Sequence, residues 1–442
     1  MNGTAAHLRE RLRTGYWLVP GGMVAVYLGL AALMLYADEV RPDLLVSMLS
    51  LLAVPGAEGS RSVLAAIAGS MVTVAATVFS ITMLTLSSAS QQFGPRVLRN
   101  FMRDRWNQVT LGTFTGTFAY ALIVLRTAGR KHGGEFVPNL SVSFALVLAI
   151  VAVVVLVLFI HHVSVLIQAP QIVAKVGVEL ERAIDELFPD DLGEEARADE
   201  PLERPGGPAR VCCFSKPGYI DAVGDSALRV AAEHGLVIEL LAKPGDFVLA
   251  GQASARVWPL DRASDEIARK VTGVFILSRA RTPAQDPGFS LGQLTEIAAR
   301  ALSSGINDPF TACVCIDYLG SALARLAGRK LPSRVRKDGT GRGTLIAPRS
   351  DFEDLLGLAC DPLHEYGSSH RVVVLHLAGM LARVAESVRR PGDHAAVLRH
   401  LARLRYNAER HLSPIAGWAE VRQDLDAATA RAAAAGRQNL DA

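Results

Sequence analysis

The chain has 442 residues, 50% of them hydrophobic, and its 46 basic and 43 acidic side chains leave a net charge of +3. This length exceeds one ordinary domain, and the near-neutral charge argues against a nucleic-acid-binding protein. The five cysteines are odd in number and form no CxxC pair, so they are expected to be reduced thiols rather than a disulfide framework.

Long apolar runs fill the first 170 residues. A spanning helix needs about 20 apolar residues to cross about 30 Å of hydrocarbon. Any one run could be a buried helix of a soluble enzyme, but four in succession favour a bilayer. The sequence therefore predicts a transmembrane domain at 17–170, with spans at about 17–37, 62–90, 108–126 and 140–168. The first run is too long for a cleavable signal and is expected to be an uncleaved anchor.

The orientation follows from the short flanking segments. Lysine and arginine mark the cytoplasmic side of a membrane protein. The N-terminal segment 1–16 and the loop after the second span are arginine-rich, whereas the loop after the first span is acidic. Both termini are therefore expected in the cytoplasm. The basic residues Arg126, Arg130 and Lys131 of the third loop disagree with this orientation.

The second span carries an unusual polar stripe. Its members recur at three, four or seven residues and so share one helical face, interrupted by Leu84. Helix packing is one interpretation, and the hydrated lining of a pore formed by several copies is the other. The absence of a charged residue in the middle of any span argues against an ion-coupled carrier. The pore-lining candidates are Thr73, Thr77, Ser80, Ser87 and Gln91.

The third span contains a small-residue motif, Gly112-x-x-x-Gly116, which allows close approach of helix backbones. These two glycines are expected to serve helix packing. Near the inner end of the fourth span, His161 and His162 are expected at the headgroup level.

After the spans, the sequence predicts an α+β cytoplasmic region. Segment 171–208 is expected to be an amphipathic helix followed by a flexible linker rich in proline and glycine. Short apolar runs separated by glycine turns predict a β-rich module over 209–285. The turns at 243–252 are similar to those of barrel-sandwich carrier domains, but no methionine-flanked lysine is present, so no cofactor is expected.

Residues 286–442 read as a helical domain. Helices are expected at 291–303, 371–389, 394–411 and from Glu420, with Asp308 as an N-cap before Pro309. The basic, glycine-rich segment from Gly328 to Arg349 is expected to be a loop.

No catalytic motif is present, and an enzyme is the last-ranked alternative. His364, Glu365 and His370 lack a metal-ligand spacing, so a solvated surface is expected there and no metal site. Arginines at a strand end that faces a helix N-terminus could hold an anion, and salt bridges with capping are the alternative. The ligand-binding candidates are Arg279, Arg281, Gln285, Asp286, Asn307 and Asp308.

Three long segments carry a family resemblance. These are TVFSITMLTLSSASQQFGPRVLRNFMRDRWNQVTLGTFTGTFAYALIVLR from Thr77, RTPAQDPGF from Arg281 and ALSSGINDPFTACVCIDYLG from Ala301. The chain resembles the bacterial predicted-membrane-protein family known as domain of unknown function 2254. Ser304 stands where the family commonly has proline. The resemblance implies a multi-pass protein of the bacterial inner membrane and brings no activity or catalytic residues.

Two hypotheses follow from these features. One is a homo-oligomeric channel-like protein whose cytoplasmic domain gates or assembles it. The alternative is a membrane-anchored sensor or regulator whose cytoplasmic domain binds a small anion or a protein partner. The expected partners are the lipid bilayer and further copies of the chain.

Overall fold

The computed structural model describes residues 17–40, 56–94, 104–128, 137–166, 168–188, 204–224, 226–338, 343–414 and 416–440. The chain divides into two compact units, Met1–Gln171 and Ile172–Ala442. The expected cytoplasmic N-terminus at 1–16 and most of the expected linker lie outside the described residues.

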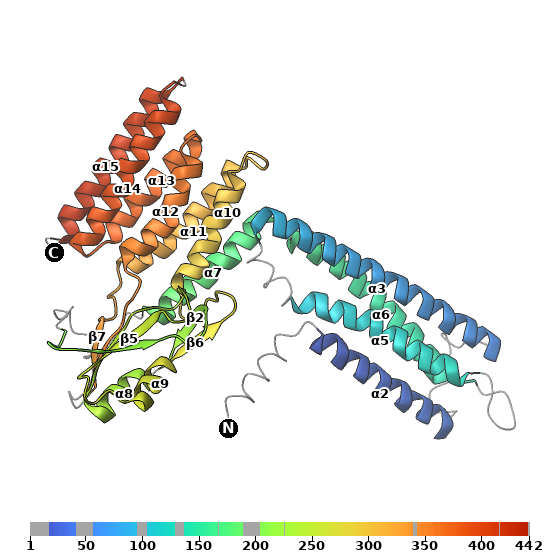
Figure 1. Ribbon diagram of the computed structural model, residues 1–442. Helices are drawn as coiled ribbons and strands as arrows, with labels where there is room; N and C mark the ends of the chain where they lie inside the picture. The colour runs from blue at the N-terminus through green and yellow to red at the C-terminus, as the bar shows by residue number, and fades with distance from the viewer. Residues whose placement is uncertain are drawn as a thin grey trace. The chain divides into compact units, whose positions relative to one another are not determined.

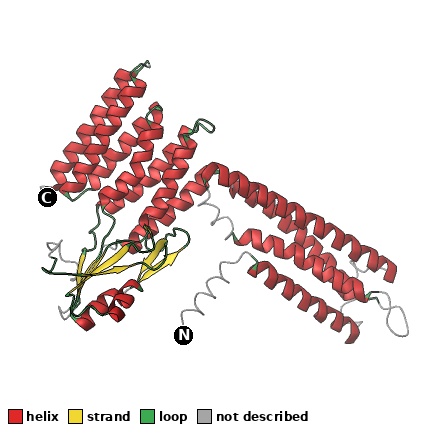
Figure 2. Cartoon of the chain, in the orientation of Figure 1, coloured by secondary structure: helices red, strands yellow, loops and turns green. Residues whose placement is uncertain are grey.

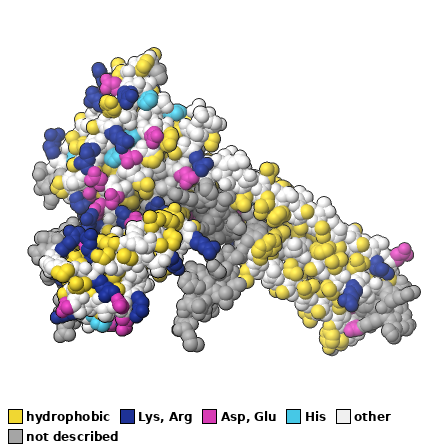
Figure 3. Space-filling model, in the orientation of Figure 1, with side chains coloured by type: hydrophobic (Ala, Val, Ile, Leu, Met, Phe, Trp, Pro, Cys, Tyr) yellow, Lys and Arg dark blue, Asp and Glu magenta, His cyan; other side chains and the backbone are white. Residues whose placement is uncertain are grey.

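Unit 1 is entirely helical in its described part (Figures 1 and 2). Its helices are α2 (Leu18–Val40), α3 (Ala57–Phe93), α5 (Arg105–Thr127) and α6 (Asn139–Leu166). Each is long and apolar enough to cross a membrane, and one further helix of unit 2, α11, meets the same criterion. The face of unit 1 seen in Figure 3 is covered mainly by hydrophobic side chains.

Helix α5 is the centre of unit 1. It packs against α2, α3 and α6, and 61% of its most apolar window is buried. Tyr120 and Phe114 of α5 are fully buried among side chains of α2, α3 and α6. The other three helices keep most of their apolar side chains on the outside, as expected when the surrounding solvent is hydrocarbon.

Helix α7 (Ala169–Leu187) begins three residues after α6 ends, and it is amphipathic as predicted. From Ile172 on it belongs to unit 2, where it packs against α11 (Pro309–Ala327). Gly177 of α7 lies against the Tyr318 ring, so close that a Cβ there would be 2.2 Å from Tyr318 Cδ1. Arg325 binds Asp185 through two hydrogen bonds of 2.6 and 2.8 Å.

The β-rich part of unit 2 contains two sheets. The first has the order β1-β5-β3-β8-β7 and the second the order β4-β2-β6. The strands are β1 (Arg210–Cys213), β2 (Gly218–Val223), β3 (Val237–Leu240), β4 (Phe247–Val248), β5 (Ala253–Trp258), β6 (Phe275–Ser278), β7 (Val335–Lys337) and β8 (Thr344–Ile346). Helices α8 (Ser226–His234) and α9 (Asp265–Thr272) lie beside them (Figure 1).

The prediction of a loop from Gly328 to Arg349 is wrong, because this segment supplies β7 and β8. Strand β8 pairs in parallel with β3, and β7 pairs with β8 in the antiparallel sense. Each has only three residues, too few to show a periodic pattern in the sequence. They form because the edge of β3 offers unpaired backbone groups and because Leu345 and Ile346 become buried.

The remaining helices form a bundle: α10 (Pro287–Ala301), α11, α12 (Phe352–Gly367), α13 (Arg371–Ser387), α14 (Pro391–Leu412) and α15 (Trp418–Leu440). Asp308 caps α11 by accepting from Thr311 N at 3.0 Å, with Pro309 at the first helical position, as predicted. Helix α12 was not among the predicted elements.

Candidate functional site

Helix α3 has two opposite faces. Its buried side chains recur along one face and pack on α5 and α6: Leu64, Ile67, Ala68, Met71, Val78, Thr85 and Ala89. The five predicted pore-lining residues are all exposed on the other face. At about 100° per residue, they and Leu84 fall within an arc of about 80° directed away from α5 and α6. We call this face, Thr73, Thr77, Ser80, Leu84, Ser87 and Gln91, the outward stripe.

The hydroxyls at the start of the outward stripe donate to their own helix. Thr73 Oγ1 donates to Gly69 O at 3.1 Å, and Thr77 Oγ1 donates to Thr73 O at 2.9 Å. Each hydroxyl proton is therefore used inside α3, and the oxygen lone pairs remain available as acceptors.

Helix α5 turns its small and polar residues inward. A Cβ on Gly112 would lie 2.6 Å from Met23 Sδ, and one on Gly116 would lie 2.8 Å from Tyr27 Cγ. The two glycines thus face α2 at a distance that admits no larger residue without rearrangement. On the same helix Thr113 donates to Val109 O at 2.9 Å, whereas the buried hydroxyls of Thr110 and Thr117 have no hydrogen-bond partner in the described structure.

An aspartate caps a helix N-terminus at each end of the α5–α6 pair. Asp38 of α2 accepts from Leu140 N at 2.9 Å and Ser141 N at 3.0 Å, and so satisfies the first turn of α6. At the other end, Asp104 caps α5 by accepting from Trp106 N and lies 2.6 Å from His162 Nε2. The sequence analysis missed both aspartates, although Asp104 directly precedes α5, where an N-cap is expected.

The six predicted ligand-binding residues do not form one site. Arg281 binds the buried Asp286 through Nε–Oδ2 and Nη2–Oδ1 distances of 2.5 and 3.1 Å, at the start of α10. Asn307 and Asp308 follow the other end of α10, which has 15 residues and a length of about 22 Å. The guanidinium of Arg281 is therefore already paired with the carboxylate of Asp286.

The other candidates also have structural partners. Gln285 Oε1 accepts from Val223 N at 3.0 Å, Asp308 caps α11, and Asn307 Oδ1 lies 3.0 Å from His370 Nε2. Arg279 is exposed and forms no ion pair in the described structure. Salt bridges and capping, the alternative from the sequence, account for these contacts.

Comparison with known proteins decides the family. The family model described as a predicted membrane protein, DUF2254, matches residues 13–383. The chain belongs to the DUF2254 family. Uncharacterized proteins of Mycobacterium bovis and Mycobacterium tuberculosis are 33% identical over 413 residues, covering 91% of this chain and 78% of theirs. No solved structure matches the chain.

Membership in DUF2254 agrees with the four apolar helices of unit 1 and establishes a membrane protein. The family description names no reaction, ligand or partner. The chemistry of this family member must therefore be argued from its own side chains.

Two histidines of the helical bundle form a pair in which His364 is buried and His400 is half-buried. The expectation of a solvated surface at His364 is wrong, because this side chain is 1% exposed and its Nε2 lies 3.0 Å from His400 Nδ1. The rings stack with an angle of 9° between their planes. Burial, together with the nearby His400 and Arg403, lowers the pKa of His364 to about 3. No cluster of three metal-ligating side chains occurs in the described part of the chain.

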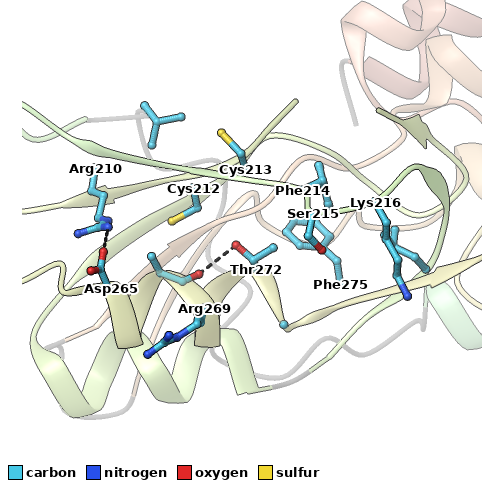
Figure 4. A pocket seen from close by; sticks show the side chains of 14 residues that line it. Arg210, Cys212, Cys213, Phe214, Ser215, Lys216, Asp265, Arg269, Thr272 and Phe275 are labelled. Atoms are coloured by element: carbon cyan, nitrogen blue, oxygen red, sulfur yellow. Dashed lines mark hydrogen bonds and ion pairs between the residues drawn. The ribbon is translucent and has the colours of Figure 1, made fainter. Parts of the chain in front are cut away.

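A basic hollow of about 790 Å³ lies between β1 and α9 (Figure 4). Arg210 pairs with Asp265 at one end and Lys216 lies at the other, with the edge-to-face rings of Phe214 and Phe275 nearby. Lys216 and Arg269 line the hollow and form no salt bridge with any residue that the structure describes. The sequence analysis did not single out this hollow, because its three cations come from separate elements.

Proposed function

We propose that the chain is the subunit of a homo-oligomeric, channel-like protein of the bacterial inner membrane in which α3 helices surround a common axis. The observation that carries the proposal is the outward stripe. In a monomer these exposed polar side chains would face hydrocarbon. Facing one another around an axis, they would line a hydrated path.

The length of the stripe supports this arrangement. From Thr73 to Gln91 it extends 18 residues, about 27 Å of helix, against a hydrocarbon thickness of about 30 Å. A packing motif between two helices needs only a few turns, whereas a path across the membrane needs the whole thickness.

The chemistry of the stripe favours a passive path for water or small cations. It contains no charged side chain, and a proton relay or ion-coupled carrier ordinarily requires one. The hydroxyls of Thr73 and Thr77 present acceptor oxygens, because their protons are donated within α3.

The proposed topology has four spans, with both termini in the cytoplasm. Helices α2, α3, α5 and α6 cross the bilayer, and α11 is proposed to stay in the cytoplasmic bundle. Its Asp317 pairs with His376 at 2.7 Å and its Arg325 pairs with Asp185 at 2.6 Å. A charged side chain in the middle of a spanning helix costs about 2.5–3.5 kcal/mol.

Cysteine substitution tests the axis. In a Cys213→Ser background, Leu84→Cys at the centre of the stripe should cross-link between subunits in bilayers. The matched variant Val153→Cys, which places a thiol on the outer surface of α6, should not. A Leu84→Cys protein that stays monomeric under oxidation contradicts the shared axis.

A flux assay tests the path itself. Purified protein in liposomes should pass water or small cations, and a water-soluble cationic thiol reagent should block the flux through Thr77→Cys but not through Val153→Cys. Absence of flux under voltage, tension and osmotic load, or a Thr77→Cys thiol that the reagent cannot reach, rejects the channel.

The second candidate function is a membrane-anchored regulator that binds a small polyanion in the basic hollow. It is favoured by Lys216 and Arg269, which line the cavity and form no salt bridge in the described structure. Pyrophosphate should raise the melting temperature of the wild-type chain and fail to do so after Lys216→Ala with Arg269→Ala. Lys175→Ala, at an exposed lysine of α7, is the control, and an equal shift in all three proteins rejects the site.

A further inference from the structure

An exposed apolar tip closes one end of the helical bundle of unit 2. Phe310, the second residue of α11, is 72% exposed, more than any other large apolar side chain described in this unit. Ile306 in the α10–α11 loop, Tyr366 at the end of α12 and Val372 at the start of α13 are 43%, 49% and 40% exposed. We call these four residues the apolar tip.

The loops that carry the apolar tip lie side by side. His370, between α12 and α13, contacts Asn307 of the α10–α11 loop at 3.0 Å. A Cβ on Gly367 would lie 3.6 Å from Leu302 Cδ1 and 2.8 Å from Val373 Cγ1. The exposed apolar side chains therefore belong to one surface and are not scattered singly.

The contacts between α7 and α11 show at which end of the bundle the apolar tip lies. Three contacts join the two helices: Gly177–Tyr318, Glu181–Ser321 and Asp185–Arg325. The residue numbers rise in both helices from one contact to the next, so the helices run parallel with a constant offset of about 140 residues. The same offset sets Ala169, the first residue of α7, level with Pro309, the first residue of α11. The apolar tip thus lies at the end of the bundle where α7 begins.

Helix α7 begins where the fourth apolar helix has just ended. Leu166 is the last residue of α6 and Ala169 the first of α7. Three residues of chain reach at most about 11 Å, so the first residue of α7 lies within that distance of the last residue of α6.

We propose that the apolar tip inserts into the headgroup region of the lipid bilayer and so fixes the cytoplasmic domain against the membrane. Phenylalanine and tyrosine on a rim of this kind bury apolar surface at the boundary of the acyl chains while the tyrosine hydroxyl stays hydrated. The inference requires that α6 spans the bilayer, and it does not depend on a pore.

Spin labelling of the full chain in nanodiscs that hold one copy tests the proposal. In a Cys213→Ser background, labels are attached at Phe310→Cys or Ile306→Cys. The control is Leu249→Cys, an equally apolar residue that is 60% exposed. It lies four residues from Gly245, which contacts Asp286 at the opposite end of α10.

We expect the labels at 306 and 310 to collide with oxygen and to lose most of their collisions with a water-soluble nickel chelate, and the label at 249 to show the reverse. Equal access of the chelate to positions 310 and 249 overturns the proposal, because the tip is then in water. Shielding from both reagents also overturns it, because the tip is then covered by protein. Since each nanodisc holds one copy, the outcome is independent of whether the oligomeric channel exists.

Discussion

Two buried carboxylates of unit 2 differ from two buried hydroxyls of unit 1 in having hydrogen-bond partners. In unit 2 the buried carboxylate of Asp286 has Arg281, and that of Glu239 has both Arg204 and Arg256. In unit 1 the buried hydroxyls of Thr110 and Thr117 have no partner in the described structure. A charge must be paired to be buried, whereas burial of an unpaired threonine hydroxyl among apolar helices costs much less free energy. Removal of a partner should therefore cost more at these buried carboxylates of unit 2 than removal of a hydroxyl at these positions of unit 1.

The largest effect is expected where a buried charge loses its partner. Arg281→Ala leaves Asp286 buried and unpaired, and should lower the free energy of unfolding of unit 2 by about 3–5 kcal/mol. Denaturant unfolding of the detergent-solubilised chain, followed by hydrogen exchange in α10, measures the loss. Arg279→Ala removes an exposed arginine of the same segment and should have no measurable effect, and equal losses in both variants would contradict the assignment.

Acid should destabilise unit 2 through its histidine pair. The pKa of His364 falls from 6.5 to about 3 on folding because the ring is buried, and burial also lowers the pKa of His400. Below pH 6.5 the unfolded chain takes up protons that the folded chain refuses, so stability is complete above that pH and declines towards pH 3. The slope is about 1.4 kcal/mol per pH unit for each proton.

Replacement of the ring tests this acid sensitivity. His364→Leu should flatten the dependence of unfolding free energy on pH between about 6.5 and 4, while His411→Leu, at an exposed histidine of α14, should leave it unchanged. An unaltered slope in the His364 variant would show that other groups govern the acid response.

In unit 1 a larger side chain between α2 and α5 should lower the stability of the helix bundle. Gly116→Leu drives a side chain into Tyr27 and should cost about 1–3 kcal/mol, measured by unfolding in mixed micelles. Gly29→Leu on α2 is the control, since nothing lies within 4 Å of a Cβ at that position. If the Gly116 variant is as stable as the control, the close approach of the two helices is not required.

The smallest expected change in stability is an increase. Thr117→Val removes a buried hydroxyl that has no partner and should raise stability by about 1 kcal/mol. Thr113→Val removes a hydroxyl that donates to Val109 O and should be neutral or slightly destabilising. A loss of stability in the Thr117 variant would indicate a partner such as bound water, and would weaken the contrast between the two units.

Much of unit 1 could be predicted from the sequence because hydrocarbon imposes a length and a composition on each helix. The predicted runs agree with α2, α3, α5 and α6 to within a few residues. The face of α3 occupied by Thr77 and Ser80 was also readable, since helical periodicity fixes which residues lie together. Which way that face points was not readable, because it depends on the contacts of Met71 and Val78 with other helices.

The candidate sites of unit 2 were less predictable, because their residues meet only through tertiary contacts. Arg281 and Asp286 are five residues apart and were singled out, but the sequence could not show that they neutralise each other. His364 and His400 are separated by 36 residues, and no periodic pattern marks His364 as buried. The cations of the basic hollow come from a strand, a turn and a helix in the same way.

Because β3 pairs in parallel with β8, the first sheet cannot be completed until β8 has been translated. About 100 residues of chain, including β5, α10 and α11, separate β3 from β8 and must be made before Leu345 can pair with Ile238. During translation one edge of the sheet therefore stays unpaired until β8 is made, and residues 209–285 expressed by themselves would lack the strand that covers this edge. A ribosome stalled before residue 344 should leave a chain that proteases and chaperones recognise as unfinished.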